Sequence, residues 1–270
     1  MQIKGKVAIV TGAGSGFGKA LSIEIVRMGG RVVCADLNAE SAISTVDSLN
    51  LNQKPPVAIF CECDVSIVGN LENLFRAAMD SFGPVDIFVG NAGVVGPEYP
   101  QLLDVCAADT ILKGDDVLSN YAAIQSCSNI NLNSIFLGTQ LAIQHFLKHN
   151  IRGVVVNTAS LAGLFGVPQA PVYAASKAGV VHFTHSMVRF HKSHGVRVNA
   201  VCPGYVKTAI GLEAARRWPI ESWVPIESVT AAFVECIENE DLFGTCLAVT
   251  ERGIARVPFA EWQRQLASML

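Results

Sequence analysis

The chain has 270 residues, of which 50% are hydrophobic and only 16% are charged, and its formal net charge is −3. This composition excludes an intrinsically disordered chain, and without runs of Lys or Arg we expect no nucleic-acid partner. Every apolar stretch is interrupted well before the roughly 18–20 residues that a bilayer requires, so we also expect no membrane span.

Short β-branched segments alternate with longer helix-like segments along the chain. Seven strands are predicted at residues 7–11, 31–36, 57–61, 85–90, 154–159, 196–202 and 245–250. Helices are predicted at residues 16–28, 39–49, 67–82, 116–149, 172–194 and 226–238. Strands that are apolar on both faces and alternate with helices indicate a doubly wound parallel α/β sheet, with ligands at the carboxyl ends of its strands. No linker or repeat divides the chain, so we predict a single domain spanning residues 1–270.

Three segments depart from this alternation. Residues 94–115 are predicted to form a long loop insertion, and residues 205–225, with two tryptophans, a lid over an apolar substrate. The alternative for the tryptophans is ordinary surface packing. The C-terminal tail, residues 251–270, carries apolar residues at helical spacing near its end and is predicted to pack at an interface or over the substrate entrance.

The first predicted strand is followed by a glycine-rich turn, TGAGSGFG, and then by a predicted helix. Glycines allow a tight turn and a close approach to a pyrophosphate, and the helix that follows offers free N–H groups. The pattern is TGxxxGxG, and it lacks the Lys-Ser/Thr of a nucleotide P-loop. We therefore predict that this turn binds a dinucleotide through Gly12, Gly14, Ser15, Gly16, Phe17 and Gly18.

Asp36 ends the second predicted strand, and Leu37 follows it. A carboxylate at this place can accept hydrogen bonds from both adenosine ribose hydroxyls and repels a 2′-phosphate. Neither Ser15 nor Leu37 provides the cation that a 2′-phosphate needs, so NAD is predicted as cofactor rather than NADP. The structural alternative is that Asp36 caps the next helix.

Tyr173 and Lys177 are spaced i and i+4 on a predicted helix, which places both on one face. Because a free tyrosine has a pKa of about 10, a nearby cation, helped by the positive nicotinamide, is needed to bring it towards neutral pH. Ser160 ends the fifth predicted strand, from which its hydroxyl can hold the substrate oxygen. Alone, a Tyr-x3-Lys pair is more often a solvated helix face.

Histidine and cysteine do not indicate a metal site. His145 and His149 are spaced i and i+4, but no carboxylate or cysteine completes the pair at ligand spacing. Cys61 and Cys63 alternate along a strand and so point to opposite faces. The 8 cysteines are scattered without a CxxC motif, and the N-terminus has no signal-peptide pattern, so a reducing, cytoplasmic location is expected.

Together with the motifs above, the sequence carries Asp64-Val65, Asn91-Ala92-Gly93, Asn131 and Pro203-Gly204-x-Val206-x-Thr208. Over nearly its whole length the chain therefore resembles the short-chain dehydrogenase/reductase family. The resemblance implies a single-domain Rossmann fold, with a doubly wound, parallel, seven-stranded sheet in the order 3-2-1-4-5-6-7 and helices on both faces. It also implies a homodimer or homotetramer.

The resemblance implies a role for each matching residue. The catalytic residues would be Tyr173 as general base or acid, Lys177, which lowers the pKa of Tyr173, Ser160, which orients the substrate oxygen, and Asn131, preferred over Asn133, in a proton relay. Tyr173 and Lys177 would also contact the cofactor, together with Asp64 and Val65 at the adenine, Asn91, Ala92 and Gly93 along its length, and Pro203, Gly204, Val206 and Thr208 at the nicotinamide end.

Some local sequences are similar to the 15-hydroxyprostaglandin dehydrogenase subgroup, which oxidises secondary alcohols of lipid-like substrates with NAD. Three features depart from it. Ala170 replaces a substrate-binding Gln, 40 positions separate Asn91 from Asn131, and Gly90 replaces the first Asn of the usual NNAG. The cofactor and the chemistry are therefore carried over, and prostaglandin as substrate is not.

The sequence thus predicts an NAD(H)-dependent oxidoreductase that interconverts a secondary alcohol and a ketone on a largely apolar small molecule, with oxidation favoured. The first alternative is a carbonyl reductase of a biosynthetic pathway, since the same groups catalyse both directions. The alternative from another class is a non-catalytic NAD(H)-binding sensor or scaffold, which would have no need of Ser160 or Asn131.

Overall fold

The computed structural model describes residues 1–96 and 114–258. Within them, one eight-stranded sheet has the order β3-β2-β1-β4-β5-β6-β7-β8. The strands are β1 (Val7–Thr11), β2 (Arg31–Asp36), β3 (Ala58–Glu62), β4 (Ile87–Gly90), β5 (Val154–Thr158), β6 (Arg197–Pro203), β7 (Cys246–Thr250) and β8 (Gly253–Arg256). All neighbouring strands are parallel except β7 and β8.

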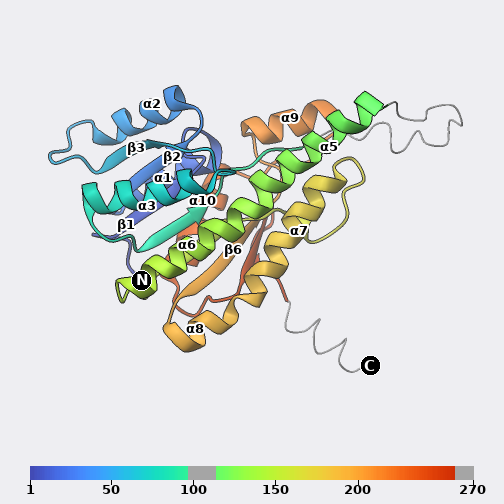
Figure 1. The fold of residues 1–270 in the computed structure, drawn as a ribbon. Coiled ribbons are helices and arrows are strands. Elements are labelled where there is room, and N and C mark those ends of the chain that lie inside the picture. Colours follow the sequence, from blue (N-terminus) through green and yellow to red (C-terminus); the bar gives the residue numbers. More distant parts are fainter. Residues whose placement is uncertain (97–113, 259–270) are drawn as a thin grey trace, which may run out of the picture.

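Helices cover both faces of the sheet (Figure 1). They are α1 (Gly16–Arg27), α2 (Ala39–Asn50), α3 (Val68–Phe82), α5 (Gly114–Ser128), α6 (Ser134–Lys148), α7 (Pro171–Ser186), α8 (Val188–His194), α9 (Ala209–Arg217) and α10 (Ile226–Glu238). No helix in the described part of the chain is both long enough and apolar enough to cross a membrane.

The core has two layers because the central strands are buried on both sides. On one face, Val10 and Val89 pack with Leu21 of α1 and Phe233 of α10. On the other face, Phe88 packs with residues of α3 and α6, while α7 covers β6 and β7. Successive residues of each strand thus supply opposite layers, as the period of two requires.

The strand order reverses at β1, which pairs with β2 on one side and with β4 on the other. The chain continues from β2 towards one edge of the sheet and from β4 towards the other edge. The loops after β1 and β4 therefore diverge and leave a crevice at the carboxyl end of the sheet. The doubly wound α/β fold and the order of the first seven strands are confirmed.

The number of strands was wrong by one, because residues 253–256, assigned to the C-terminal tail, form the antiparallel strand β8. All four residues of β8 are exposed, so the strand carries no apolar alternation that a sequence pattern could detect. The chain reverses before it at Glu251 and Arg252, and Gly253 has a φ of +121°. Residues 259–270 of the tail lie outside the described residues.

Two long helices also differ from expectation. The helix predicted over residues 116–149 is interrupted by a π-helical turn (Asn129–Asn133) between α5 and α6. The helix predicted over residues 172–194 is divided at Met187 into α7 and α8. Of the predicted insertion at residues 94–115, residues 97–113 lie outside the described residues.

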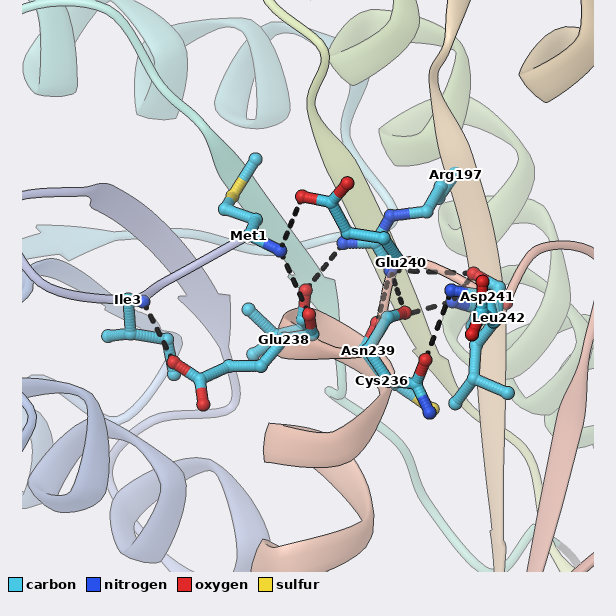
Figure 2. A network of polar contacts seen from close by, with 11 residues as sticks. Met1, Ile3, Arg197, Cys236, Glu238, Asn239, Glu240, Asp241 and Leu242 are labelled. Carbon is cyan, nitrogen blue, oxygen red and sulfur yellow. Dashed lines mark hydrogen bonds and ion pairs between the residues drawn. The ribbon is translucent and has the colours of Figure 1, made fainter.

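A buried arginine ties α10 to the sheet. Arg197 of β6 is only 3% exposed, and its guanidinium donates to four carbonyl oxygens at the C-terminal end of α10 and just beyond it. Figure 2 shows Arg197 beside three of the acceptors, Cys236, Asn239 and Leu242, and the fourth acceptor is Ile237. A cation at this place satisfies carbonyls that have no partner within the helix and complements the negative end of its dipole.

Candidate active site

A cavity of about 400 Å³ lies at the carboxyl end of the sheet. Most of the predicted site residues border it. From the glycine-rich turn these are Gly12, Ser15, Gly16 and Phe17, from the following loops Asp36, Leu37, Asp64, Val65, Asn91, Ala92 and Gly93, and from the later half Ser160, Tyr173, Lys177, Pro203, Gly204, Val206 and Thr208. Gly14, Gly18 and Asn131 do not border it.

The glycines of the turn permit close packing that a side chain would prevent. A Cβ at Gly18 would lie 2.1 Å from the carbonyl oxygen of Gly12, and one at Gly14 would lie 2.2 Å from Oγ of Ser41. Gly12 itself has a φ of +67°. Ser15, at the N-cap position of α1, makes no side-chain capping bond, so first-turn N–H groups beside the cavity are available to an anion such as a pyrophosphate.

Asp36 closes one end of the cavity and does not cap a helix. Its Oδ2 accepts from the N–H of Gly14 at 2.8 Å and its Oδ1 from that of Asn38 at 2.9 Å. The N-cap of α2 is Asn38, whose side chain accepts from Ser41 N–H, so the capping alternative for Asp36 was wrong. Among the described residues that border the cavity, the one Lys or Arg is Lys177, so no cation stands beside Asp36 for a 2′-phosphate.

Hydrogen bonds hold the loop after β4 against β1. The Thr11 hydroxyl accepts from the N–H groups of Asn91 and Ala92 at 2.8 and 3.0 Å. The Asn91 amide donates to the Thr11 carbonyl at 2.9 Å and accepts from the Thr158 hydroxyl at 3.1 Å. The sequence reasoning did not assign Thr11 or Thr158 to the site, although each ends a strand at the edge where a ligand would bind.

Ser160, Tyr173 and Lys177 come together at the other end of the cavity. Ser160 follows β5, and its Oγ accepts from the Ala162 N–H at 3.2 Å. Tyr173 lies in the first turn of α7, which begins at Pro171, and Lys177 lies one turn later. Lys177 Nζ is 5.8 Å from the centroid of the Tyr173 ring and donates to the Thr158 carbonyl at 2.8 Å.

Burial dominates the electrostatics of this pair. It raises the pKa of the Tyr173 phenol to about 12, although a hydrogen bond with Ser160 acts in the lowering direction. Burial also lowers the pKa of Lys177, which is 3% exposed, to about 8. The protein's own groups thus disfavour the phenolate, and the sequence argument that Lys177 brings Tyr173 towards neutral pH requires the further positive charge of a nicotinamide.

Asn131 is fully buried in the π-helical turn, and its side chain is fully engaged. Its Oδ1 accepts from the Val94 N–H at 2.9 Å, and its Nδ2 donates to the Val94 carbonyl at 2.8 Å. The same Nδ2 lies 3.3 Å from Ser176 Oγ and 3.4 Å from Cys127 Sγ. The amide therefore pins the loop after β4 to the helix and does not reach the cavity.

The segment from Gly204 to Trp218 borders the rest of the cavity and contains a helix that the sequence did not predict. Thr208 caps this helix, α9, by accepting from the Gly211 N–H. The wall here is mainly apolar, and its side chains are Leu161, Phe165, Val167, Ala170, Ile210 and Ala214. Two side chains of the predicted lid, Tyr205 and Trp218, also border it.

No group of three or more His, Cys, Asp or Glu side chains able to hold a metal ion occurs within residues 1–96 and 114–258. The donors around the cavity are instead hydroxyl, phenol, amine and backbone groups. They suit a ligand with three parts: a ribose at Asp36, an anionic group at the first turn of α1, and an oxygen at Ser160 and Tyr173. The residues present therefore fit a dinucleotide.

Comparison with known proteins agrees with this arrangement. A family model described as short chain dehydrogenase matches residues 6–217. Human 15-hydroxyprostaglandin dehydrogenase [NAD(+)] is 36% identical over 214 residues, which cover 78% of this chain and 71% of that protein. The 3beta-hydroxysteroid dehydrogenase 2 of Eggerthella lenta is 33% identical over 211 residues, covering 78% and 74%. The crystal structure of levodione reductase superposes with a TM-score of 0.78 at 23% identity, covering 91% of this chain and 96% of that one.

Proposed function

The chain belongs to the short-chain dehydrogenase family, and from that premise we propose that it oxidises a secondary alcohol of a largely apolar small molecule to the ketone. At the coarser level it is an oxidoreductase that acts on hydroxyl or keto groups, and its cofactor is NAD. The observation that carries the proposal is the meeting of Ser160, Tyr173 and Lys177 in one mainly apolar cavity that also reaches Asp36.

In this proposal NAD, when bound, supplies the acceptor for the hydride that leaves the carbinol carbon. Ser160 and Tyr173 hold the substrate hydroxyl, and the Tyr173 phenolate takes its proton. Lys177, fixed on the Thr158 carbonyl, stabilises the phenolate and would contact the nicotinamide ribose. Asn131 acts indirectly, because it holds Val94 and so keeps the neighbouring Gly93 near Lys177: a Cβ at Gly93 would lie 3.2 Å from Asn131 Oδ1 and 3.6 Å from Lys177 Nζ.

The proposed cofactor contacts follow the lining of the cavity. Gly12, Ser15, Gly16 and Phe17 would face the pyrophosphate, Asp36 and Leu37 the adenosine ribose, and Asp64 and Val65 the adenine. Gly14 and Gly18 would support these residues without touching the cofactor, because the absence of a side chain lets the turn pack closely. Residues 91–93 would lie along the cofactor, and Pro203, Gly204, Val206 and Thr208 near its nicotinamide end.

An apolar substrate is supported by the wall formed by Leu161, Phe165 and Ile210. The segment at residues 205–225, which includes α9, is the proposed lid, since it supplies this side of the cavity. We further propose a single domain and a homodimer or homotetramer. The described cysteines are all free thiols, which supports a reducing, cytoplasmic location.

The test is the absorbance of NADH during incubation of the protein with NAD and a panel of secondary alcohols, and the reverse assay with NADH and the matching ketones. We expect oxidation of long-chain secondary alcohols, and a Tyr173→Phe variant that binds NADH like the wild type but has lost at least about 10³-fold in kcat. Full activity of that variant would contradict the assignment. Turnover of ketones alone would favour a reductase, and tight NADH binding without any turnover would favour a sensor.

A further inference from the structure

Tyr205 contributes a phenol to a cavity whose lining is mainly apolar. It follows β6 after Gly204, is 39% exposed, and borders the cavity together with Trp218. The same cavity is also lined by Phe165, Ile210 and other apolar side chains. A phenol in such surroundings orients a ligand, because the few polar groups of an apolar pocket set its specificity.

Hydrogen bonds hold Tyr205 both at its backbone and at its phenol oxygen. Its backbone carbonyl accepts from the Val224 N–H at 2.7 Å, and Gly204 before it donates to the Val249 carbonyl at 2.9 Å. At the other end, the phenol oxygen accepts from Trp218 Nε1 at 3.0 Å. Because these bonds already fix the Tyr205 side chain, little of its side-chain entropy is lost when a ligand bonds to the hydroxyl.

The hydroxyl of Tyr205 still has a hydrogen to give. A phenol can accept and donate at once, and the bond from Trp218 uses its oxygen only. Among the described residues, no acceptor takes the Tyr205 O–H. The same cavity holds Tyr173, and the nearness of the Tyr205 phenol is one of the smaller influences that raise the pKa of Tyr173, after burial as the largest.

We propose that the Tyr205 hydroxyl donates a hydrogen bond to a second oxygen of the substrate, one that does not react. This inference rests on the proposed function and narrows its substrate class. The substrate is then an apolar molecule that carries, besides the secondary alcohol held by Ser160 and Tyr173, a further acceptor such as an ester, ketone or carboxylate oxygen.

The test compares substrates with and without the second oxygen. Methyl 5-hydroxyhexanoate, methyl 7-hydroxyoctanoate and methyl 9-hydroxydecanoate vary its distance from the carbinol, and decan-2-ol lacks it. We expect the wild type to prefer at least one ester. In Tyr205→Phe, kcat/KM for that ester should fall about tenfold, mainly through KM, while decan-2-ol stays within about twofold. Trp218→Phe should give a smaller loss of the same selectivity.

The matched control is Tyr121→Phe, since this exposed phenol on α5 also accepts from a side-chain nitrogen, Nε2 of Gln125, at 3.0 Å but does not border the cavity. It should leave both kinds of substrate unchanged. If Tyr205→Phe lowers ester and alkanol equally, Tyr205 only holds Trp218, and the proposal is overturned. An unchanged ester rate, or a wild type without preference for any ester, also overturns it.

A binding measurement separates this inference from the proposed reaction. The measurement uses the Tyr173→Phe variant with NADH present. Calorimetry gives the Kd of three keto esters, methyl 5-oxohexanoate, methyl 7-oxooctanoate and methyl 9-oxodecanoate, and the Kd of decan-2-one for comparison. Adding Tyr205→Phe should weaken at least one keto ester about tenfold and spare the ketone. Unchanged keto-ester binding overturns the role of Tyr205 even if the enzyme oxidises alcohols. A selective loss supports it even if no alcohol is turned over.

Discussion

At the scale of single residues, Asp36 is hydrogen-bonded to the glycine-rich turn and is the residue that we propose selects the cofactor. One carboxylate oxygen holds the Gly14 N–H, and no cation stands beside it among the described residues of the cavity. Its position at the end of β2 could be predicted from the sequence. That it does not cap α2 could not, because Asn38, two residues later, offers an equally good cap.

The change Asp36→Asn keeps an acceptor for Gly14 but removes the charge that repels a 2′-phosphate. We expect the preference for NAD over NADP, as the ratio of kcat/KM values, to fall at least about tenfold. The free energy of unfolding should stay close to that of the wild type. Asp47→Asn, at an exposed position on α2, is the control. A variant that keeps the full preference would show that Asp36 does not read the ribose.

The burial of Lys177 should make the free energy of unfolding depend on pH. Burial lowers its pKa from 10.5 to about 8 in the folded protein, so the unfolded chain holds this proton more tightly. The cost of the buried charge is fully present below pH 8 and disappears as the pH rises from about 8 to 10.5. Across that window the wild type should gain about 3 kcal/mol relative to Lys177→Met.

The measurement is urea unfolding of both proteins at a series of pH values between 7 and 10.5. Lys192→Met, at an exposed position on α8, serves as the control and should follow the wild type. Parallel stability curves for the wild type and Lys177→Met would contradict the lowered pKa of Lys177.

At the scale of elements, buried strands were the most predictable feature. The bounds of β1 and β2 agree with the sequence because apolar, β-branched residues run through them and end at Thr11 and Asp36. Helix α9 was missed because two of its apolar residues, Ile210 and Leu212, are 38% and 49% exposed, so no buried stripe marks it. Strand β8 was missed for the same physical reason, since all its residues are exposed.

The contact between Arg197 and α10 gives a prediction at this scale. Arg197→Ala leaves several buried carbonyl oxygens without a donor and a cavity behind β6, so it should cost about 3 kcal/mol or more. Arg27→Ala, which breaks only the surface ion pair with Glu24 on α1, should cost less than about 0.5 kcal/mol. Thermal or chemical unfolding compares them. Equal, small losses would mean that Arg197 does not hold the end of α10.

At the scale of the whole molecule, the active site is assembled from loops between β1 and α9 that meet only because the strands are parallel and share one edge. Most residues that the sequence assigned to the site, from Gly12 to Thr208, therefore border the cavity, whereas Gly14, Gly18 and Asn131 do not. The sequence did not predict that Tyr205 meets Trp218, because this contact depends on the path of the chain through α9. Nor did it predict the raised pKa of Tyr173, since burial is a property of the packed molecule.

In the proposed reaction, this chain moves a hydride from a secondary alcohol to NAD while Tyr173 takes the proton. The most direct measurement is incubation with NAD and decan-2-ol deuterated at the carbinol carbon, followed by NMR of the nicotinamide. We predict one deuteron on a single face of the nicotinamide ring for each decan-2-one formed, and none with Tyr173→Phe. Reduced cofactor without deuterium, or equal transfer by Tyr173→Phe, would contradict the account.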